Sequence, residues 1–461
     1  MDTETYDVIV IGAGQAGGPL STAIARQGRK TALIEREHVG GTCINVGCTP
    51  TKTMVASARV AHLARRAADY GVQTGPLHIE LGAVRQRKRA IVESFRGGSQ
   101  GSIEGTPGVD LIFGTASFSG ERSVAVALND GTQRQLSAPT IIINAGARPL
   151  VPDLPGLADV PYLDSTSIME LDEVPAHLIV LGGGYIALEF AQMFRRFGSD
   201  VTIVQRSGQL LGREDADIAA AVAGVLSEDG VNVLLNTAVV KVERDGPAVV
   251  LTVDGPEGEQ TIGASHLLLA IGRIPNSDRL NLRAAGVAVD RRGAIQVNER
   301  LETSAPGIYA AGDINGGPAF THIAYDDYRI LRANLIEGGG ATTTGRQVPY
   351  VVFIDPQLGR IGLSERDARA QGREVRVATM PMSHVARALE VDEPRGLMKA
   401  LVDPDSGQIL GYTVLGVEGG ELMSVVQMAM LGKLPYTALR DAIFAHPTLA
   451  ESLNNLFAQL G

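Results

Sequence analysis

Two cysteines, Cys43 and Cys48, are the only ones among the 461 residues, and they stand five positions apart. A disulfide between them would close a loop of six residues. So short a loop removes little entropy from the unfolded chain, and the bond would therefore add little stability. Short spacing suits a bond that opens and closes during a reaction. The pair is a candidate redox disulfide, and the alternative is two buried thiols that never pair.

A βαβ pattern typical of dinucleotide binding precedes the cysteines. It consists of a buried strand over 6–11, a helix that ends near Gly28, and a strand over 30–35. The turn that opens the helix carries three glycines, namely Gly12, Gly14 and Gly17. They permit, in that order, the tight turn, close approach of backbone to a pyrophosphate, and close packing of helix on strand. The second strand ends at Glu35, whose carboxylate suits ribose hydroxyls.

The same pattern recurs over 177–205. Gly182 and Gly198 are sixteen positions apart, as are Gly12 and Gly28. The glycine turn of the repeat contains Gly182, Gly184 and, in the place of Gly17, Ala187. The repeat predicts that the chain binds two dinucleotides. The alternative is a pair of ordinary packing turns with incidental glycines.

The two patterns differ at the end of their second strand, where Gln205 stands twenty-three positions after Gly182, as Glu35 does after Gly12. A carboxylate at this place binds the ribose 2′-hydroxyl and repels a 2′-phosphate, whereas an amide does not repel it. Arg206 is available to pair with such a phosphate. We therefore favour NADPH over NADH, although an arginine also follows Glu35 and is not diagnostic by itself.

Three later segments resemble strands that return to the first domain. The strands near 138–149 and 266–276 end in turns at Gly146 and Gly272, and we expect both turns to approach a cofactor. A strand over 308–310 leads to Asp313, whose carboxylate is placed to reach a polar cofactor atom. The alternative for Asp313 is a helix N-cap.

After about residue 345 the pattern changes to strands, including 348–353 and 397–402, and a helix over 421–433, which indicates a separate α+β domain. His446 lies near its end, five positions before Glu451. The carboxylate could orient the imidazole in a hydrogen-bonded pair. The alternative is a surface histidine near a helix cap.

The composition, with 44% hydrophobic and 20% charged residues, is typical of a globular protein. The chain has 41 Lys and Arg and 51 Asp and Glu residues, which give a net charge of −10. This negative charge argues against binding to nucleic acid or to an anionic membrane. We expect no signal peptide, and the sequence contains no apolar run of membrane-spanning length. We expect a cytoplasmic protein, because catalytic disulfides are found in that compartment and lasting ones are rare there.

Taken together, these motifs resemble the flavin-dependent pyridine nucleotide–disulfide oxidoreductases, the group of glutathione reductase, lipoamide dehydrogenase and mercuric reductase. The resemblance rests on the segment 40–52, both glycine turns, Ala311-Gly312-Asp313, and the run from His446 to Glu451, and it covers essentially the whole chain. Within the group, the segments 326–330, 348–350 and 434–457 are most similar to mercuric-reductase-like proteins and to the reactive-chlorine-resistance copper reductase.

The resemblance implies FAD on the first pattern and the nicotinamide coenzyme on the second. The implied FAD contacts are Gly12, Gly14, Gly17, Glu35, Thr42, Lys52, Ala116, Gly146 and Asp313. The implied coenzyme contacts are Gly182, Gly184, Tyr185, Ala187, Gln205, Arg206 and Gly272. Tyr185 would swing aside when the nicotinamide stacks on the flavin, and Glu189 would pair with Lys52.

The resemblance also implies the roles of the catalytic residues. Cys48 would lie against the flavin, and Cys43 would be the exposed thiol that attacks the acceptor. Lys52 and a helix that begins near the cysteines would stabilise thiolate charge. His446, oriented by Glu451, would act across the interface of a homodimer and move the proton that thiol–disulfide exchange requires.

The implied activity is NAD(P)H-dependent reduction of a disulfide or of a metal ion such as Cu(II), and no resident metal is expected. A second pair of cysteines near the C-terminus, which mercuric reductase uses to pass Hg(II) inward, is missing from the sequence. An enzyme similar to glutathione reductase or lipoamide dehydrogenase is the alternative, although Gln205 argues against the latter. A redox sensor without sustained turnover is the alternative of another class.

The predicted fold is α/β, with two Rossmann-like domains for FAD and NAD(P) and a C-terminal α+β dimerisation domain. We expect an FAD-binding part over 1–148 and an NAD(P)-binding part over 149–272. The chain would then return to the FAD-binding domain over 273–345 and form the dimerisation domain over 346–461.

Overall fold

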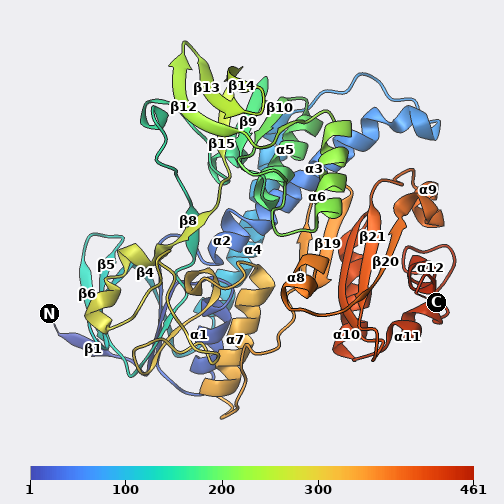
Figure 1. Ribbon diagram of the computed structural model, residues 1–461. Coiled ribbons are helices and arrows are strands. Elements are labelled where there is room, and N and C mark those ends of the chain that lie inside the picture. The colour runs from blue at the N-terminus through green and yellow to red at the C-terminus, as the bar shows by residue number, and fades with distance from the viewer. Residues whose placement is uncertain (1, 461) are drawn as a thin grey trace. The chain divides into compact units, whose positions relative to one another are not determined.

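A computed structural model describes residues 2–460, which fold into two compact units (Figure 1). Unit 1 comprises Met1–Thr53, Ala83–Leu150 and Gly272–Arg346. Unit 2 comprises Met54–Gly82, Val151–Ile271 and Gln347–Gly461. The chain therefore passes between the units several times, and each unit is built from segments far apart in the sequence.

The centre of unit 1 is an eight-stranded sheet with the order β1-β6-β5-β4-β3-β2-β7-β17. Its strands are β1 (Thr3–Thr5), β2 (Val8–Ile11), β3 (Thr31–Glu35), β4 (Val109–Gly120), β5 (Ser123–Leu128), β6 (Gln133–Ser137), β7 (Thr140–Ile143) and β17 (Ile308–Ala310). The strands from β4 to β17 in this order are parallel, while β5 pairs antiparallel with β4 and β6. The order reverses around β2, which is the place where such sheets bind dinucleotides.

Both faces of this sheet are buried, which explains why β2 reads as an unbroken apolar run. Val8 and Val10 pack in one core with the helices α1 (Gly17–Ala25) and α7 (Thr321–Leu335). Ile9 and Ile11 point to the opposite core. Figure 1 shows α1 in blue beside α7 in light orange, in agreement with their direct contact.

The remaining elements of unit 1 include the segments around the cysteines. They are α2 (Gly41–Asn45), the start of α3 (Cys48–Arg65), most of α4 (Leu81–Glu104), and the short antiparallel ribbon of β8 (Ala147–Pro149) and β16 (Arg273–Pro275). The 3-10 helices η4 (Asn276–Arg279), η5 (Leu282–Ala285) and η6 (Gly312–Asn315) complete the unit.

Unit 2 contains a second parallel sheet, of order β11-β10-β9-β15. Its strands are β9 (His177–Leu181), β10 (Asp200–Val204), β11 (Asn232–Leu234) and β15 (His266–Leu269), and its helices are α5 (Tyr185–Phe197) and α6 (Ala216–Glu228). An antiparallel sheet of β12 (Ala238–Asp245), β13 (Ala248–Gly255) and β14 (Gly258–Ala264) connects β11 to β15. The order again reverses around the first strand, here β9.

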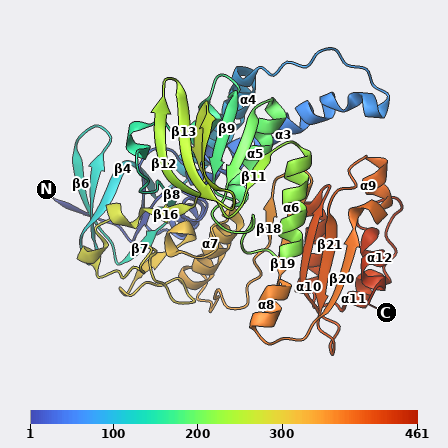
Figure 2. The same cartoon turned by 45° about the horizontal axis from the view of Figure 1, so that its top comes forward.

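The C-terminal part of unit 2 is an antiparallel sheet of order β18-β19-β22-β21-β20. Its strands are β18 (Tyr350–Val352), β19 (Gln357–Gly362), β20 (Arg376–Pro381), β21 (Leu397–Val402) and β22 (Ile409–Gly416), and its helices are α8 (Glu365–Ala370), α9 (Ala386–Glu390), α10 (Gly419–Leu431), α11 (Tyr436–Arg440) and α12 (Ser452–Ala458). The core formed with α10 and α12 contains Met398, Tyr412 and Val414. Figure 2 shows α6 in green on one side of this sheet and α12 in red on the other.

The elements agree with the predicted fold class. Both βαβ patterns form as predicted, and Gly28 and Gly198, which follow their helices, have φ angles of +77° and +121°. The helix expected over 421–433 begins and ends two residues earlier. It ends before Lys433, which adopts a φ of +53° that an α-helix cannot continue. The division into four segments, from 1–148 to 346–461, stays a prediction.

Candidate active site

The two sulfur atoms lie at the start of α3. Cys43 belongs to the short helix α2, and Cys48 is the first residue of α3. Both are thiols in this structure, and the Cys43 side chain is within hydrogen-bond reach of Cys48. The spacing of five positions therefore brings the side chains together, as a redox pair requires.

Two helix N-termini converge on this pair. Cys48 begins the eighteen-residue helix α3, and Thr321 begins the fifteen-residue helix α7. The Oγ1 atom of Thr321 lies 3.3 Å from Sγ of Cys48. The partial positive charge of a helix N-terminus and a hydroxyl donor both favour a thiolate. Lys52 is one turn after Cys48 on the same face of α3.

The pKa of Cys43 is raised well above its ordinary range, first by the hydrogen bond with Cys48 and second by burial. The hydroxyl of Thr321 and the charge of Lys52 act in the opposite direction. A thiol whose pKa is raised in this way needs a base before it can act as a nucleophile.

Cys48 is exposed and Cys43 is half-buried. Cys43 lies inside α2 next to the buried Ile44, whereas Cys48 caps the open end of α3. The assignment of Cys48 to the flavin and Cys43 to the acceptor stays a prediction.

The first glycine turn is packed as tightly as its pattern predicts. Gly12 has a φ of +100°, and a Cβ there would lie 2.4 Å from the carbonyl oxygen of Asn144. A Cβ on Gly17 would lie 2.1 Å from the carbonyl oxygen of Gly12, so only glycine lets the helix approach the strand this closely. Gly14 has a further steric requirement, because its Cβ would lie 2.7 Å from Oδ1 of Asn144.

Asn144 connects the segments that frame this turn. It lies at the end of β7 and is 8% exposed. Its Oδ1 accepts the N–H of Gly17 at 3.0 Å, and its Nδ2 donates to the carbonyl of Ala311 at 2.7 Å. A carboxamide is required, because one end accepts and the other donates. The sequence analysis missed this residue, although a polar side chain that ends an apolar strand is a signal.

Two carboxylates flank the turn. Glu35, at the end of β3, accepts the N–H of Ala13 at 2.9 Å through one oxygen and that of Glu37 at 2.9 Å through the other. Asp313 lies inside the 3-10 helix η6, so it is not the N-cap that was the alternative. Burial raises the pKa of the Asp313 carboxyl, and the nearby Arg273 partly offsets this effect. A half-buried carboxyl of this kind suits hydroxyl donors from a ligand.

The remaining predicted FAD contacts also belong to unit 1. Thr42 lies in α2 next to Cys43, and Ala116 is buried in β4. Gly146 has a φ of +65° and Gly272 one of +142°. The carbonyl of Gly146 accepts from Asn276 and that of Gly272 from Leu150, both at 3.0 Å, so the two turns flank the ribbon of β8 and β16.

The second glycine turn repeats this geometry. Gly182 has a φ of +113°, and a Cβ there would lie 2.5 Å from the carbonyl oxygen of Ala270. A Cβ on Gly183 would lie 2.9 Å from Cδ of Gln205, whereas the space beside Gly184 is open. Gln205 donates to Oγ of Ser207 at 2.5 Å, and Arg206 is exposed.

The helix α5 carries the predicted gate and lysine partner. Tyr185 is its first residue, and Glu189 follows one turn later on the same face. Ala187 is fully buried. Glu189 is 2% exposed, and its Oε1 accepts the N–H of Phe353 at 2.8 Å. Glu189 and Lys52 belong to different units, and their pairing stays a prediction.

The histidine–glutamate pair near the C-terminus forms as predicted. Nδ1 of His446 lies 2.9 Å from Oε2 and 3.1 Å from Oε1 of Glu451. Glu451 is the N-cap of α12, but its side chain binds the imidazole and not the helix backbone. The His446 side chain is 69% exposed, so its other nitrogen is accessible to a partner.

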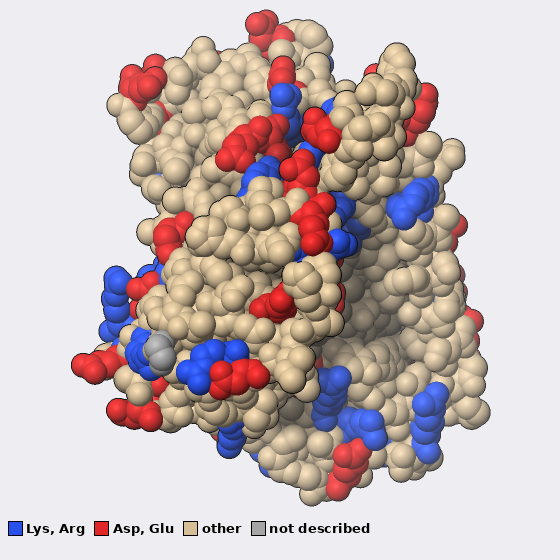
Figure 3. Space-filling view, turned by 90° about the vertical axis from the view of Figure 1, so that its right-hand side faces the viewer, with Lys and Arg blue, Asp and Glu red and all other residues tan. Residues whose placement is uncertain are grey.

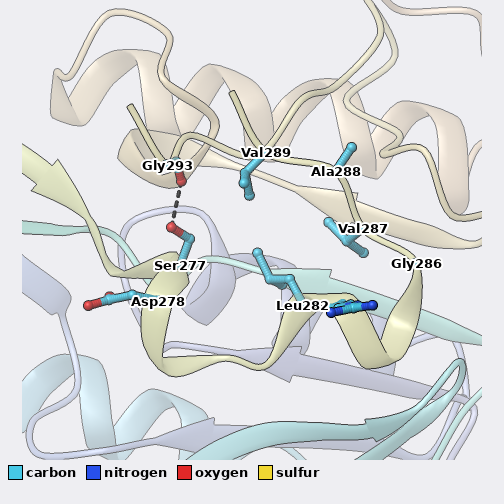
Figure 4. A pocket seen from close by; sticks show the side chains of 9 residues that line it. Ser277, Asp278, Leu282, Gly286, Val287, Ala288, Val289 and Gly293 are labelled. Atoms are coloured by element: carbon cyan, nitrogen blue, oxygen red, sulfur yellow. Dashed lines mark hydrogen bonds between the residues drawn. The ribbon is translucent and has the colours of Figure 1, made fainter. Parts of the chain in front are cut away.

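A surface pocket of about 460 Å³ in unit 1 involves none of the predicted site residues. Figure 4 shows Leu282 and Val289 pointing toward each other across it and the Ser277 hydroxyl donating to the carbonyl of Gly293 at 2.5 Å. The residues that line it are mainly apolar, and they also include the charged residues Asp278 and Arg283. The sequence analysis predicted no function for this segment.

The structure therefore brings Cys43, Cys48 and Lys52 together, and separately His446 and Glu451. It adds Thr321 and Asn144, which the sequence analysis missed. Thr321 is 273 positions from Cys48, and no local pattern could have connected them. Within residues 2–460, no group of three or more His, Cys, Asp or Glu side chains is arranged to hold a metal ion. Over the same residues, every helix is too short or too polar to cross a bilayer.

Comparison with known proteins yields two family models. Residues 6–327 match the pyridine nucleotide-disulphide oxidoreductase family, and residues 348–457 match the dimerisation domain of that family. A probable pyridine nucleotide-disulfide oxidoreductase of Escherichia coli, RclA, is 40% identical over 457 residues, which cover 98% of this chain and 99% of RclA. The mercuric reductase of Acidithiobacillus ferrooxidans is 36% identical over 98% of this chain and 82% of the relative.

Solved structures agree with these relatives. A Cu(II) complex of the HOCl-induced flavoprotein disulfide reductase RclA from Escherichia coli superposes with a TM-score of 0.91 at 38% identity, over all of both chains. A Cu(II) complex of the C43S mutant of the same protein superposes equally well. The predicted resemblance is confirmed, and so are the cofactors FAD and NAD(P)H. The match to the dimerisation domain supports a homodimer. The chain belongs to the pyridine nucleotide–disulfide oxidoreductase family and is a flavoprotein disulfide reductase of the RclA and mercuric reductase type.

Proposed function

We propose that this reductase takes two electrons from NADPH and passes them through Cys43 and Cys48, either both to a disulfide or one each to two metal ions such as Cu(II). The observation that supports this most is the contact of both sulfur atoms at the N-termini of α3 and α7, beside Thr321 and Lys52. Such an environment stabilises one thiolate of a pair, which a sulfur-based electron relay needs.

The residues of unit 1 suit FAD. The turn Gly12–Gly17 presents a helix N-terminus to a pyrophosphate, and Glu35 and Asp313 offer carboxylate acceptors to hydroxyl groups. We assign the contacts implied by the resemblance, from Gly12 to Asp313, to this cofactor. When bound, FAD supplies two-electron transfer between the nicotinamide and sulfur.

The protein side chains then have distinct tasks. Lys52, Thr321 and the two helix N-termini hold negative charge on Cys48, while Cys43 keeps its proton. His446, held by Glu451, removes that proton when Cys43 attacks the acceptor and returns a proton to the leaving group. We propose that His446 serves Cys43 of the second subunit, since the chain has the dimerisation domain of the family and the His446 side chain is exposed.

The preference for NADPH is supported by the end of β10. Gln205 carries no charge, and its side chain is held by Ser207 and by the carbonyl of Gln209. Arg206 next to it is exposed and forms no ion pair with the residues from 2 to 460. An uncharged residue followed by an available guanidinium accepts a 2′-phosphate and lacks the carboxylate that would repel it.

Cu(II) is an acceptor that the sulfur pair could reduce, because thiolates and imidazoles are favourable ligands for copper. Similarity to the RclA structures that contain Cu(II) supports this choice. The ion would be held transiently, as substrate, by the sulfur atoms and a group of the second subunit. We propose the cytoplasm as the compartment, where NADPH keeps such a thiol pair reduced.

The test is a comparison of half-reactions in Cys43→Ser. This variant should still show flavin reduction by NADPH in stopped-flow absorbance, because Cys43 is needed only for the later transfer. It should lose steady-state turnover of a small disulfide and of Cu(II). Because RclA with a C43S mutation was solved as a Cu(II) complex, turnover and not metal binding must be measured.

Two outcomes would contradict the proposal. Normal turnover in Cys43→Ser would exclude the cysteine relay. Stoichiometric reduction of the wild-type protein without turnover of any acceptor in a panel of disulfides, quinones and metal ions would indicate a redox sensor.

A further inference from the structure

One face of α5 is bound to the backbone of a single turn. Glu189, Gln192 and Arg196 are three and four positions apart, so they lie on the same face as Tyr185. All three are almost completely buried, at 2%, 3% and 5% exposed. Each binds the segment 353–355, which links β18 to β19 in the dimerisation domain.

The contacts of Gln192 are specific for an amide. Its Oε1 accepts the N–H of Asp355 at 2.7 Å, and its Nε2 donates to the carbonyl of the same residue at 2.8 Å. Nε2 also donates to Oδ2 of Asp229 at 2.8 Å. Gln192 therefore pairs with one residue's backbone as a neighbouring strand would, and neither a carboxylate nor a hydroxyl could replace it.

Arg196 reinforces the same attachment one turn later. Its Nη1 donates to Oδ2 of Asp355 at 2.6 Å, and its Nη2 donates to the carbonyl of Asp355 at 3.1 Å. It also pairs with Asp229 at 3.1 Å. Because all these groups are buried, their hydrogen bonds fix the distance and rotation of α5 relative to the turn.

These hydrogen bonds determine the position of the Glu189 carboxylate. Its Oε1 is held by the N–H of Phe353, two residues before the backbone that Gln192 binds. A carboxylate held by a backbone N–H has a defined plane and position only if helix and turn keep their spacing. Of the two side chains that set this spacing, Gln192 and Arg196, Gln192 is the nearer to Glu189 along α5.

We infer that Gln192 is a positioning residue, which locks α5 onto the turn 353–355 and so orients the Glu189 carboxylate for hydride delivery. The inference rests on the proposed function and on the predicted pairing of Glu189 with Lys52 beside the flavin. Misplacement of such a group by about 1 Å can cost as much as about 100-fold in rate. We expect about a tenfold loss from Gln192, because Arg196 keeps part of the attachment.

The experiment is a double-mutant cycle on the holoenzyme with Gln192→Met, Glu189→Gln and the double variant. Methionine keeps the length and volume of glutamine and removes its hydrogen bonds. Stopped-flow absorbance gives the limiting rate of flavin reduction and the apparent Kd for NADPH. The single variants should each lower the limiting rate about tenfold or more, with Kd for NADPH unchanged. The double variant should be no slower than Glu189→Gln.

Amide hydrogen exchange provides a readout that does not depend on turnover. Gln192→Met should accelerate exchange at Phe353 as well as at Asp355, because Glu189 loses its fixed position. Lys399→Met is the matched control. Lys399 is 3% exposed and binds Asp217 at 2.8 Å, so it also joins a helix of the nicotinamide domain to the C-terminal sheet. This variant should lower the melting temperature and leave the limiting rate of flavin reduction unchanged.

The possible failures are distinguishable. A slow Glu189→Gln with a wild-type rate in Gln192→Met would overturn the inference alone, as would a double variant whose loss is the product of the two single losses. A wild-type rate in Glu189→Gln would overturn the role of Glu189 in the proposed function, and the inference with it. If Gln192→Met does not fold, Gln192→Asn, which keeps the amide but shortens its reach, takes its place in the same cycle.

Discussion

A single residue distinguishes the ends of the two glycine-turn patterns. Glu35 and Gln205 occupy equivalent positions at the ends of β3 and β10, and both touch the second residue of their glycine turn. The shared geometry leaves charge as the difference between them. A test at this position therefore isolates an electrostatic effect from any change of fold.

Gln205→Glu should convert the preference from NADPH toward NADH. The introduced carboxylate would repel a 2′-phosphate, and we expect kcat/KM for NADPH to fall by about tenfold while that for NADH rises. Steady-state kinetics with both coenzymes measure the ratio. Gln260→Glu makes the same chemical change on an exposed residue of β14 and should leave the ratio as it is. An unchanged ratio in Gln205→Glu would remove the basis for proposing NADPH.

Asn144 should control retention of FAD. In Asn144→Asp, one oxygen can still accept from Gly17, but the other faces the carbonyl of Ala311 and adds negative charge near the pyrophosphate. We expect the Kd for FAD to rise at least tenfold, as measured by fluorescence titration of the apoprotein. Asn334→Asp is the control, since Asn334 also donates to a carbonyl, that of Ala341, but near the other end of α7. Equal FAD affinity in both variants would show that the Asn144 amide does not position the site.

At the scale of elements, α3 connects both units and ends in a buried ionic cluster. His62, on its later turns, lies near Arg196, Asp229 and Asp355. Its Nε2 is buried and accepts no hydrogen bond from residues 2–460. Burial, and second the charge of Arg196, lower the pKa of His62 to about 4 from an ordinary value of 6.5. The imidazole is therefore neutral in the folded protein over most of the acidic range.

This histidine should make unit 2 sensitive to acid. Between pH 6.5 and about 4 the unfolded chain binds a proton at His62 and the folded chain does not, so stability falls as the pH is lowered through this range. Because the imidazole is only partly buried, we expect a loss of about 1–2 kcal/mol. Thermal unfolding at several pH values should show a smaller pH dependence for His62→Gln than for the wild type.

His78→Gln serves as the control for this measurement. His78 is an exposed histidine paired with Glu80 at 3.1 Å, and its replacement should leave the pH dependence of unfolding unchanged. Parallel curves of stability against pH for the wild type and His62→Gln between pH 6.5 and 4 would show that His62 does not cause the pH dependence.

At the scale of the whole molecule, the match to the dimerisation domain supports a homodimer. Ile443, three residues before His446, is fully exposed, and Met428 and Leu431 on α10 are 66% and 55% exposed. Apolar side chains of this size gather where a second subunit packs. On the face shown in Figure 3, Lys and Arg side chains lie close to Asp and Glu among a larger tan area, so charges of the two signs are interspersed there.

A site shared between subunits predicts complementation. A heterodimer of one Cys43→Ser subunit and one His446→Gln subunit, purified through two different tags, contains one site with both wild-type residues if the site is shared. It should recover about half of the wild-type turnover, although each parent homodimer is nearly inactive.

The reciprocal heterodimer makes this test decisive. It combines a wild-type subunit with a Cys43→Ser/His446→Gln subunit and should be nearly inactive if the site is shared. About half of the wild-type activity in this heterodimer, and none in the first, would instead place both residues of each site in one chain.

Much of the fold could be predicted because its signals are local. Alternation of apolar residues, the glycines of two turns and the acid or amide that follows them all lie within about thirty residues, and each depends on backbone sterics that neighbouring residues dictate. The His446–Glu451 pair could also be predicted, because the two residues are only five positions apart. The predicted helix over 421–433 ended two residues too late, because Lys433 takes a left-handed conformation that cannot be predicted from the residue type.

The sequence by itself determined the two dinucleotide-binding patterns, the cysteine pair and the α+β domain at the end of the chain, since each is written in residues that are neighbours along the chain. Only the tertiary structure decided that Thr321 meets Cys48, that Asn144 joins Gly17 to Ala311, and that Gln192 binds the backbone of Asp355. These contacts join residues between 127 and 273 positions apart. Such contacts arise when packed sheets bring distant strand ends and helix N-termini together, and no spacing along the chain encodes them.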